Sequence, residues 1–141
     1  MNSKTDRFEL QSSGEGDGDA MSNALIFMNS HWRDEPERAI VAVVAANTAA
    51  IAGQTAIIFC TMDAVRLGTE GGSEGLALDG FPDPAEVLPE FIDNGGELWL
   101  CGTCAKPRGI TEDQLVKGAR VVGAAKLLEE VIAGAKTISL S

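Results

Sequence analysis

The chain has 141 residues, which is enough for one domain with one hydrophobic core. Its formal net charge of -10 argues against a nucleic-acid backbone or an anionic membrane surface as a partner, and no apolar run is long enough to cross a bilayer. Residues 1–20 lack the apolar segment of a signal peptide, so the expected compartment is the cytoplasm.

The predicted elements begin after an N-terminal tail. Residues 1–20 are rich in Gly, Ser and Asp and show no hydrophobic period, which predicts a disordered tail ahead of a domain at 21–141. Aromatic residues make up only 5% of the chain, so the core of that domain must be mainly aliphatic. The apolar run at 24–28 is expected to form its first strand.

A helix is predicted to follow, with Asp34 as its N-cap and Pro36 in its first turn. Gly53 is expected to end it. The helix is predicted from the helical spacing of four residues: Ile40, Val44, Thr48 and Ile51. Because apolar residues surround the helix almost completely, we expect a partner surface to cover what one face of a sheet cannot.

The middle of the chain is expected to hold a strand, a loop and two helices. Residues 55–61 are β-branched and apolar, as in a strand covered on both faces, and a short helix is predicted at 64–67. The glycine-rich segment 68–80 predicts a loop. Asp83 then marks the start of a helix that Pro89 should shorten or kink.

The last third of the chain is expected to continue the alternation. A third core strand is predicted at 97–101 and a last strand at 136–141. The capping-box pattern at 111–114 predicts a helix near 112–117. A longer helix is predicted at 121–133.

Strands that alternate with helices predict a parallel sheet whose strands all end at one edge, and open sheets of this kind bind ligands there. Cys60 ends one predicted strand and Cys101 ends another, so both thiols are expected near that edge. Three cysteines, an odd number without a signal peptide, favour free thiols over a disulfide framework. We expect Cys60 to be buried as a small apolar residue.

The sequence CGTC at 101–104 is compatible with more than one chemistry. A zinc site needs four ligands, and Cys60 and the single His31 are the only distant candidates, so this reading is weak. A thioredoxin-like dithiol needs its first cysteine at a helix N-terminus, but Pro107 and Gly109 are expected to postpone the regular helix.

The favoured chemistry is that of a nucleophilic thiol. Cys101 is the last residue of a buried strand and is followed by a turn at Gly102. Between Glu97 and Glu112 the only charged residues are Lys106 and Arg108. Positive charge near a thiol favours the thiolate, which is its reactive form. Packing alone accounts less well for two cysteines beside one turn.

Two stretches, CGTCAKPRGITEDQLVKGARVVG from Cys101 and DEPERAIVAVVAANTAAIAGQTAIIFCTMDAVRL from Asp34, resemble the DsrE/DsrF-like family, which includes YchN-type proteins and small sulfur-relay subunits. The resemblance covers residues 23–140. It implies a single compact α/β domain, with a mainly parallel five-stranded sheet and helices on both faces. It also implies assembly as a homo-oligomer, a trimer or hexamer.

The chemistry implied by the resemblance is sulfur trafficking. Cys101 falls on the family's sulfur-accepting cysteine, which holds sulfur as a persulfide and passes it to an acceptor thiol. Cys104 matches a second cysteine of YchN-type members and is expected to resolve the persulfide through a disulfide. Arg108 and Lys106 would stabilise the anion, with help from backbone N–H groups of the Gly102 turn. No metal or organic cofactor is required.

Two further residues are expected at the same edge, Thr61 after one strand and His31 after another, as part of the substrate pocket. The expected partners are donor and acceptor proteins of sulfur or small sulfane-sulfur compounds. Two alternatives remain open. One is a non-catalytic assembly or regulatory module whose cysteine loop docks a partner, and the other is a CxxC thiol-disulfide oxidoreductase.

Overall fold

The computed structural model describes residues 21–140, so the predicted disordered tail at 1–20 lies outside the described residues. Within the described part of the chain, five strands form one sheet in the order β4-β3-β2-β1-β5, and every neighbouring pair is parallel. The strands, in chain order, are β1 (Leu25–Asn29), β2 (Ala56–Cys60), β3 (Glu97–Cys101), β4 (Ala119–Val122) and β5 (Lys136–Ser139).

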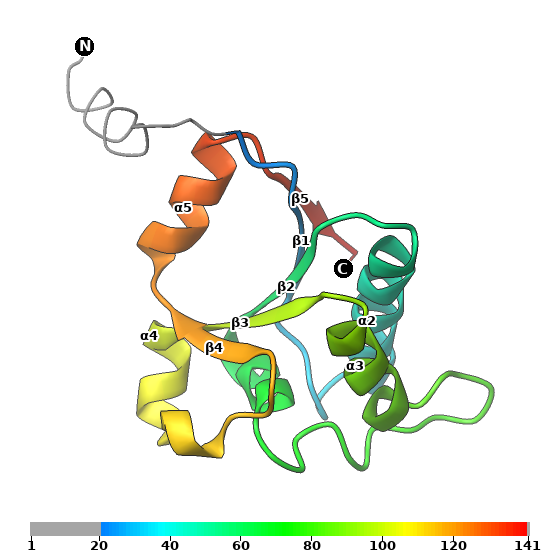
Figure 1. Ribbon diagram of the computed structural model, residues 1–141. Helices are drawn as coiled ribbons and strands as arrows, with labels where there is room; N and C mark the ends of the chain where they lie inside the picture. The colour runs from blue at the N-terminus through cyan, green and yellow to red at the C-terminus, as the bar shows by residue number, and fades with distance from the viewer. Residues whose placement is uncertain (1–20, 141) are drawn as a thin grey trace.

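Helices cover both faces of the sheet, as predicted (Figure 1). On one face lie α2 (Pro36–Ile51) and α3 (Pro84–Asp93), and on the other lies α5 (Ala124–Ile132). All five residues of the central strand β2 are buried, which confirms the prediction of a strand covered on both faces. The fold is therefore a single α/β domain with a parallel sheet.

The two faces carry separate hydrophobic clusters because side chains alternate along each strand. The larger cluster joins β-strand residues such as Ile58 and Leu98 to Val43 of α2 and Phe91 of α3. The smaller cluster lies under α5, where Leu127 packs against it, and its members come mainly from the strands: Ala24, Ile26, Ile57, Phe59, Trp99, Val122 and Ala135. The face under α5 is thus the more thinly covered one.

The start of α2 differs from the prediction, and its buried face consists mostly of small residues. Its N-cap is Glu35, and the Asp34 carboxylate instead accepts a hydrogen bond from the Trp32 backbone N–H at 2.8 Å. Val44 is only half-buried, and Ile51 is exposed. The buried face is made mostly of alanines, which let the helix approach the sheet closely: Ala39, Ile40, Ala42, Val43, Ala46, Asn47 and Ala50. The helix predicted from the spacing of the large side chains is therefore confirmed, and of those side chains Ile40 is the one that is fully buried.

The region after β3 contains a strand that the prediction missed. Residues 119–122 form β4 at the edge of the sheet, so the helix predicted at 121–133 begins instead at Ala124, with Gly123 as its N-cap. The helix predicted near 112–117 is only the 3-10 turn η3 (Glu112–Gln114), although both hydrogen bonds of its capping box are present. Pairing with β3 determines the state of residues 119–122, and that contact is not local in sequence.

Candidate functional site

The cysteine segment leaves the sheet at the carboxyl end of β3. Cys101 is the last residue of that strand and the N-cap of a four-residue helix, α4 (Gly102–Ala105), which continues into the 3-10 helix η2 (Lys106–Arg108). The prediction that Pro107 and Gly109 postpone helical structure was therefore wrong. Gly109, with φ at 71°, ends this helical segment.

Cys101 and Cys104 are both free thiols of intermediate exposure. The two residues pack against different clusters. Cys101 contacts the cluster under α5, and Cys104 contacts the larger cluster under α2 and α3. The two cysteines therefore lie on opposite sides of the end of β3, one toward each face of the sheet.

Arg108 stabilises this loop rather than standing free beside the thiols. Its Nε donates to Oδ1 of Asp63 at 2.9 Å, and its Nη1 donates to the backbone carbonyl of Cys104 at 3.1 Å. Asp63 belongs to the 3-10 helix η1 (Met62–Gly68), which follows β2. The cysteine segment at 101–111 contains no Asp or Glu, so the carboxylate that pairs with Arg108 comes from Asp63, after the end of β2. This carboxylate offsets the positive charge of Arg108.

Cys60 has a different environment from the other two thiols. It ends β2 with 0% of its surface exposed, which confirms the prediction that it is a packing residue. Burial raises its pKa from 9.0 to about 12, because the apolar surroundings disfavour the thiolate. At neutral pH this thiol is therefore neutral and inert.

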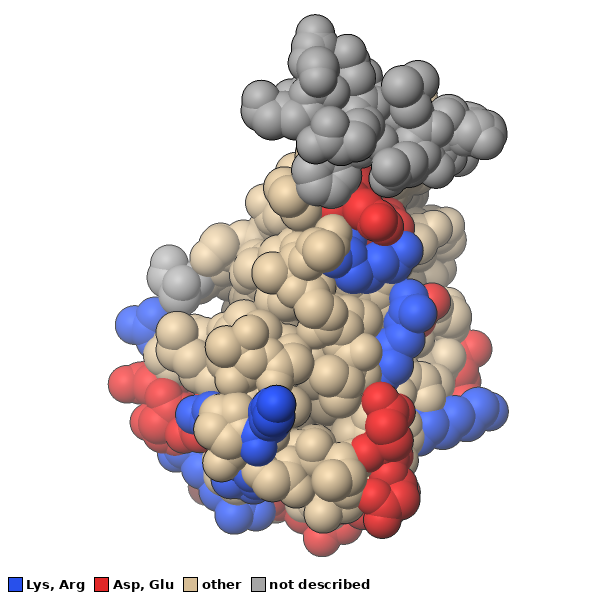
Figure 2. Space-filling model, turned by 90° about the vertical axis from the view of Figure 1, so that its left-hand side faces the viewer, with Lys and Arg blue, Asp and Glu red and all other residues tan. Residues whose placement is uncertain are grey.

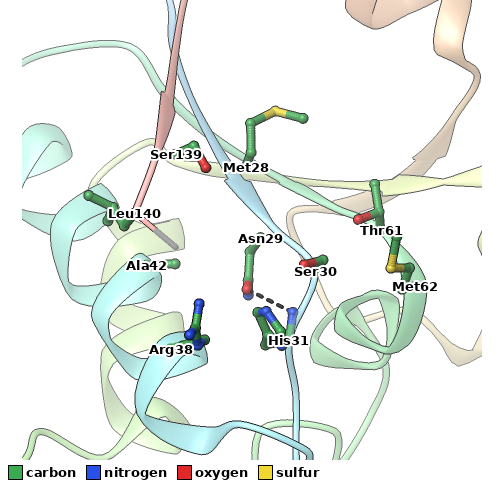
Figure 3. Close-up of a pocket in the computed structure, with 10 residues that line it drawn as sticks. All are labelled: Met28, Asn29, Ser30, His31, Arg38, Ala42, Thr61, Met62, Ser139 and Leu140. Atoms are coloured by element: carbon green, nitrogen blue, oxygen red, sulfur yellow. Dashed lines mark hydrogen bonds between the residues drawn. The ribbon is translucent and has the colours of Figure 1, made fainter.

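His31 and Thr61 lie in a separate cavity of about 250 Å³ at the same edge of the sheet (Figure 3). Its walls come from the carboxyl ends of β1, β2 and β5 and from α2, and the lining residues are Met28, Asn29, Ser30, His31, Arg38, Ala42, Thr61, Met62, Ser139 and Leu140. The predicted residues Cys101, Gly102, Cys104, Lys106 and Arg108 are not among them. The structure therefore divides the predicted site into two groups.

The sequence analysis missed four polar residues that line the cavity: Asn29, Ser30, Arg38 and Ser139. An asparagine at the end of the otherwise apolar strand LIFMN was a local signal for the first. Arg38 lies on α2, and only the packing of α2 beside β1 brings it to this edge. His31 is oriented by Asp34, whose Oδ2 lies 2.9 Å from Nδ1 of the imidazole. Hydrogen bonds from the Trp32 backbone and from His31 lower the pKa of Asp34.

Within residues 21–140, no group of three or more His, Cys, Asp or Glu residues is arranged to hold a metal ion. No helix among these residues is long and apolar enough to span a membrane.

The fold and the site together define the class of protein: a small α/β domain with a parallel sheet and a partly exposed pair of free cysteines, in a CxxC motif, at the end of a buried strand. The model of the DsrE/DsrF-like family matches residues 23–140, and the chain belongs to that family. Its members are generally sulfur-relay proteins. The resemblance seen in the sequence is thereby confirmed.

The chain is also similar in sequence to two uncharacterized proteins. The chain is 35% identical over 85 residues to the uncharacterized protein MK0008 of Methanopyrus kandleri, an alignment that covers 60% of this chain and 67% of the relative. It is 25% identical over 104 residues to the uncharacterized protein MJ0760 of Methanocaldococcus jannaschii, covering 74% of this chain and 38% of that protein. The chain thus spans well under half of the second relative.

Two solved structures share the fold. The ychN protein of E. coli superposes with a TM-score of 0.60 at 18% identity, covering 85% of this chain and 100% of that one. MTH1491 from Methanobacterium thermoautotrophicum, a protein of unknown function, superposes with a TM-score of 0.64 at 13% identity, covering 84% and 99%. At these identities the likeness extends to the fold alone.

Proposed function

We propose that the protein is an intracellular sulfur carrier in which Cys101 accepts sulfane sulfur and passes it to an acceptor thiol. The observation that supports this most is a free, partly exposed thiol at the carboxyl end of a core strand, in a member of a family of sulfur-relay proteins. The expected compartment is the cytoplasm, where thiols stay reduced.

The proposed reaction has two displacements at sulfur. In the first, the Cys101 thiolate attacks the sulfane sulfur of a donor such as thiosulfate, an S–S bond forms, and sulfite leaves with the electron pair of the broken bond. In the second, an acceptor thiolate attacks the terminal sulfur, and the Cys101 thiolate leaves. No net oxidation of the protein occurs, so the cycle needs no cofactor.

The residues around Cys101 have different proposed roles. Arg108 acts as a positioning residue, because it ties the carbonyl of Cys104 to Asp63 on the neighbouring element. Lys106 is exposed and supplies positive charge at the loop surface. The backbone N–H of Gly102 is a further predicted contact for a persulfide anion.

Cys104 is proposed to resolve the persulfide. Its thiolate would attack the inner sulfur of Cys101, form a Cys101–Cys104 disulfide and release hydrosulfide, and a reductant thiol would then have to restore the dithiol. Because the two cysteines pack against opposite clusters, one side chain has to turn out of its cluster first. We therefore expect this step to be slow compared with transfer to an external acceptor.

The test is mass spectrometry of the reduced protein after exposure to thiosulfate, tetrathionate or polysulfide. The carrier proposal expects an added sulfur atom or a thiosulfonate adduct on the peptide that contains Cys101, and no loading of Cys101→Ser. Cys60 is an internal control because it is buried and stays unmodified while the protein is folded. Loading of Cys101→Ser at Cys104 to the wild-type extent would overturn the assignment.

A second candidate function is that of a thiol-disulfide oxidoreductase. It is favoured by one observation, namely that helical structure begins directly after Cys101, with Cys104 inside the first turn. This arrangement is the one that such dithiols use to stabilise a thiolate. Reduction of a protein disulfide by the dithiol, absent in Cys104→Ser, would favour this function. In that case exposure to sulfane-sulfur donors would leave no lasting adduct on Cys101.

A further inference from the structure

The cavity lined by His31 and Thr61 lies where the strand order of the sheet reverses. From β1 the chain adds β2, β3 and β4 in one direction, and β5 then joins the other side of β1. In open parallel sheets the crevice at such a reversal, beyond the carboxyl ends of the strands, is the usual place for a ligand. The cavity of about 250 Å³ occupies this position, between the ends of β1 and β5 and the first turns of α2.

One wall of the cavity holds a buried polar group without a partner. Asn29 is only 5% exposed, and its Oδ1 accepts a hydrogen bond from the backbone N–H of His31 at 3.0 Å. Its Nδ2, in contrast, has no hydrogen-bond partner among the described residues. Figure 3 shows the end of this side chain between His31 and Arg38, facing the space that they enclose. Because an unpaired buried donor lowers stability, a ligand that accepts from Nδ2 would relieve that cost.

The charged and hydrogen-bonding groups of the cavity favour an anion. Arg38 supplies a guanidinium, Ser30 and Thr61 supply hydroxyls, and no Asp or Glu is among the lining residues. Two carboxylates that do not line the cavity contact residues that do. Glu35 is an exposed partner of Arg38 Nε at 3.7 Å, and Asp34 bonds Nδ1 of His31. Such an exposed ion pair is weak, so the guanidinium remains able to bind a ligand.

We propose that this cavity binds a small molecule through an oxyanion group, either a carboxylate or a tetrahedral oxyanion of sulfur or phosphorus. The Asn29 amide and the Arg38 guanidinium donate to its oxygens, and a planar guanidinium suits two such oxygens at once. This proposal is independent of the proposed sulfur-carrier function, because no residue of the cysteine loop lines the cavity.

The test is an NMR titration of the full-length protein at constant ionic strength. Sodium acetate, sulfate and phosphate are added in separate arms, with chloride as the reference, and the side-chain amide signals of Asn29 are followed. We expect a saturable shift of these signals in at least one arm, and the arm in which it occurs distinguishes a carboxylate from a tetrahedral oxyanion.

Variants then locate the site. Arg38→Gln should weaken binding at least tenfold, whereas Arg120→Gln, which removes an arginine stacked on Trp99 under α5, should leave it unchanged. Asn29→Asp keeps the shape of the side chain and replaces the donor by a negative oxygen, so it should abolish binding, which is followed in this variant through the backbone amide signal of His31. If that variant does not fold, Arg38→Gln alone decides, because Arg38 is an exposed residue.

Two results would overturn the proposal. One is the absence of a saturable shift of the Asn29 amide with all three anions, and the other is an equal affinity in Arg38→Gln and Arg120→Gln. Cys101→Ser should bind the anion as the wild type does, so failure of this site and failure of sulfur loading on Cys101 are separate outcomes.

Discussion

At the scale of single residues, the three cysteines show how position in the sheet sets thiol chemistry. Cys60 and Cys101 both end strands, and sequence alone predicted this placement for both. What separates them is burial, since Cys60 lies in a central strand under helices, whereas Cys101 lies next to the edge strand β4. The partner of Arg108 was beyond prediction, because Asp63 precedes it by 45 residues.

The raised pKa of Cys60 predicts a loss of stability in alkali. The unfolded state releases the thiol proton near pH 9.0, but the folded state retains it to about pH 12. The stability is therefore fully present below pH 9.0 and falls as the pH rises toward 12, by at most about 1.4 kcal/mol per pH unit. Urea unfolding at about pH 8 and about pH 10.5 should show a decrease for the wild type that is about 1–2 kcal/mol larger than for Cys60→Ala.

Comparison with Cys60→Ala isolates this effect because both proteins contain the same lysines and the same two partly exposed thiols. The substitution lowers stability at every pH by leaving a small cavity, so the quantity to compare is the change between the two pH values. Equal decreases in the two proteins would mean that Cys60 ionises without unfolding.

The contacts of Arg108 predict that it stabilises the cysteine loop. Arg108→Gln removes the ion pair with Asp63 and the bond to the Cys104 carbonyl, so the free energy of unfolding should decrease by about 1 kcal/mol. Lys106→Gln, a change at an exposed residue, should stay within about 0.5 kcal/mol of the wild type. Chemical denaturation measures both. If the two variants were equally stable, Arg108 would act through its charge and not through the shape of the loop.

At the scale of elements, the sequence predicted well what local pattern controls. The ends of β3 and the first turn of α3 agree with the prediction, and Asp83 caps α3 through a bond from the Ala85 N–H at 3.0 Å. β4 was missed because the helical period of α5 extends back into Val121 and Val122. Arg38 was missed for a similar reason, since its place in the cavity depends on how α2 packs.

The backbone turn that leads into β4 requires a glycine at position 118. Its φ is +86°, and an added Cβ would lie 2.6 Å from Cδ1 and 2.7 Å from Cγ2 of Ile92 on α3. Gly53, at φ +87°, has open space at the same position, so Gly53→Ala reports the backbone strain alone. That strain should cost roughly 1–2 kcal/mol, and Gly118→Ala should cost about 1–3 kcal/mol more because of the clash.

Thermal or urea unfolding of the two alanine variants provides the comparison. Hydrogen exchange of the amides in β3 and β4 should also accelerate more in Gly118→Ala than in Gly53→Ala, where it should follow the loss of global stability alone. Equal losses of stability would show that Ile92 moves aside at little cost.

At the scale of the whole molecule, the two faces of the sheet differ in how completely they are covered. On the face of α2 and α3 the helices are long and contact each other. On the other face α5 has nine residues, none of them fully buried. Figure 2, which looks at the molecule from the side of α5 in Figure 1, shows a broad central area with few charged side chains and charges around its border.

Exposed apolar residues of α5 lead us to propose that this face binds further copies of the chain, as in the trimer or hexamer expected from the sequence. Leu128, Val131 and Ile132 are 47%, 40% and 47% exposed. Apolar surface of this kind on an otherwise strongly charged protein is typical of an interface.

Light scattering after size exclusion at micromolar concentration should give a trimer or hexamer for the wild type and a monomer for the double variant Leu128→Lys, Ile132→Lys, because two desolvated ammonium groups oppose association. Ile51→Lys is the matched control, since Ile51 is 62% exposed on α2, the helix at which the sequence predicted a partner surface, and its variant should keep the mass of the wild type if the interface lies on α5. A wild-type protein with the mass of one chain would contradict the assembly, and an unchanged mass in the double variant would place the interface on another face.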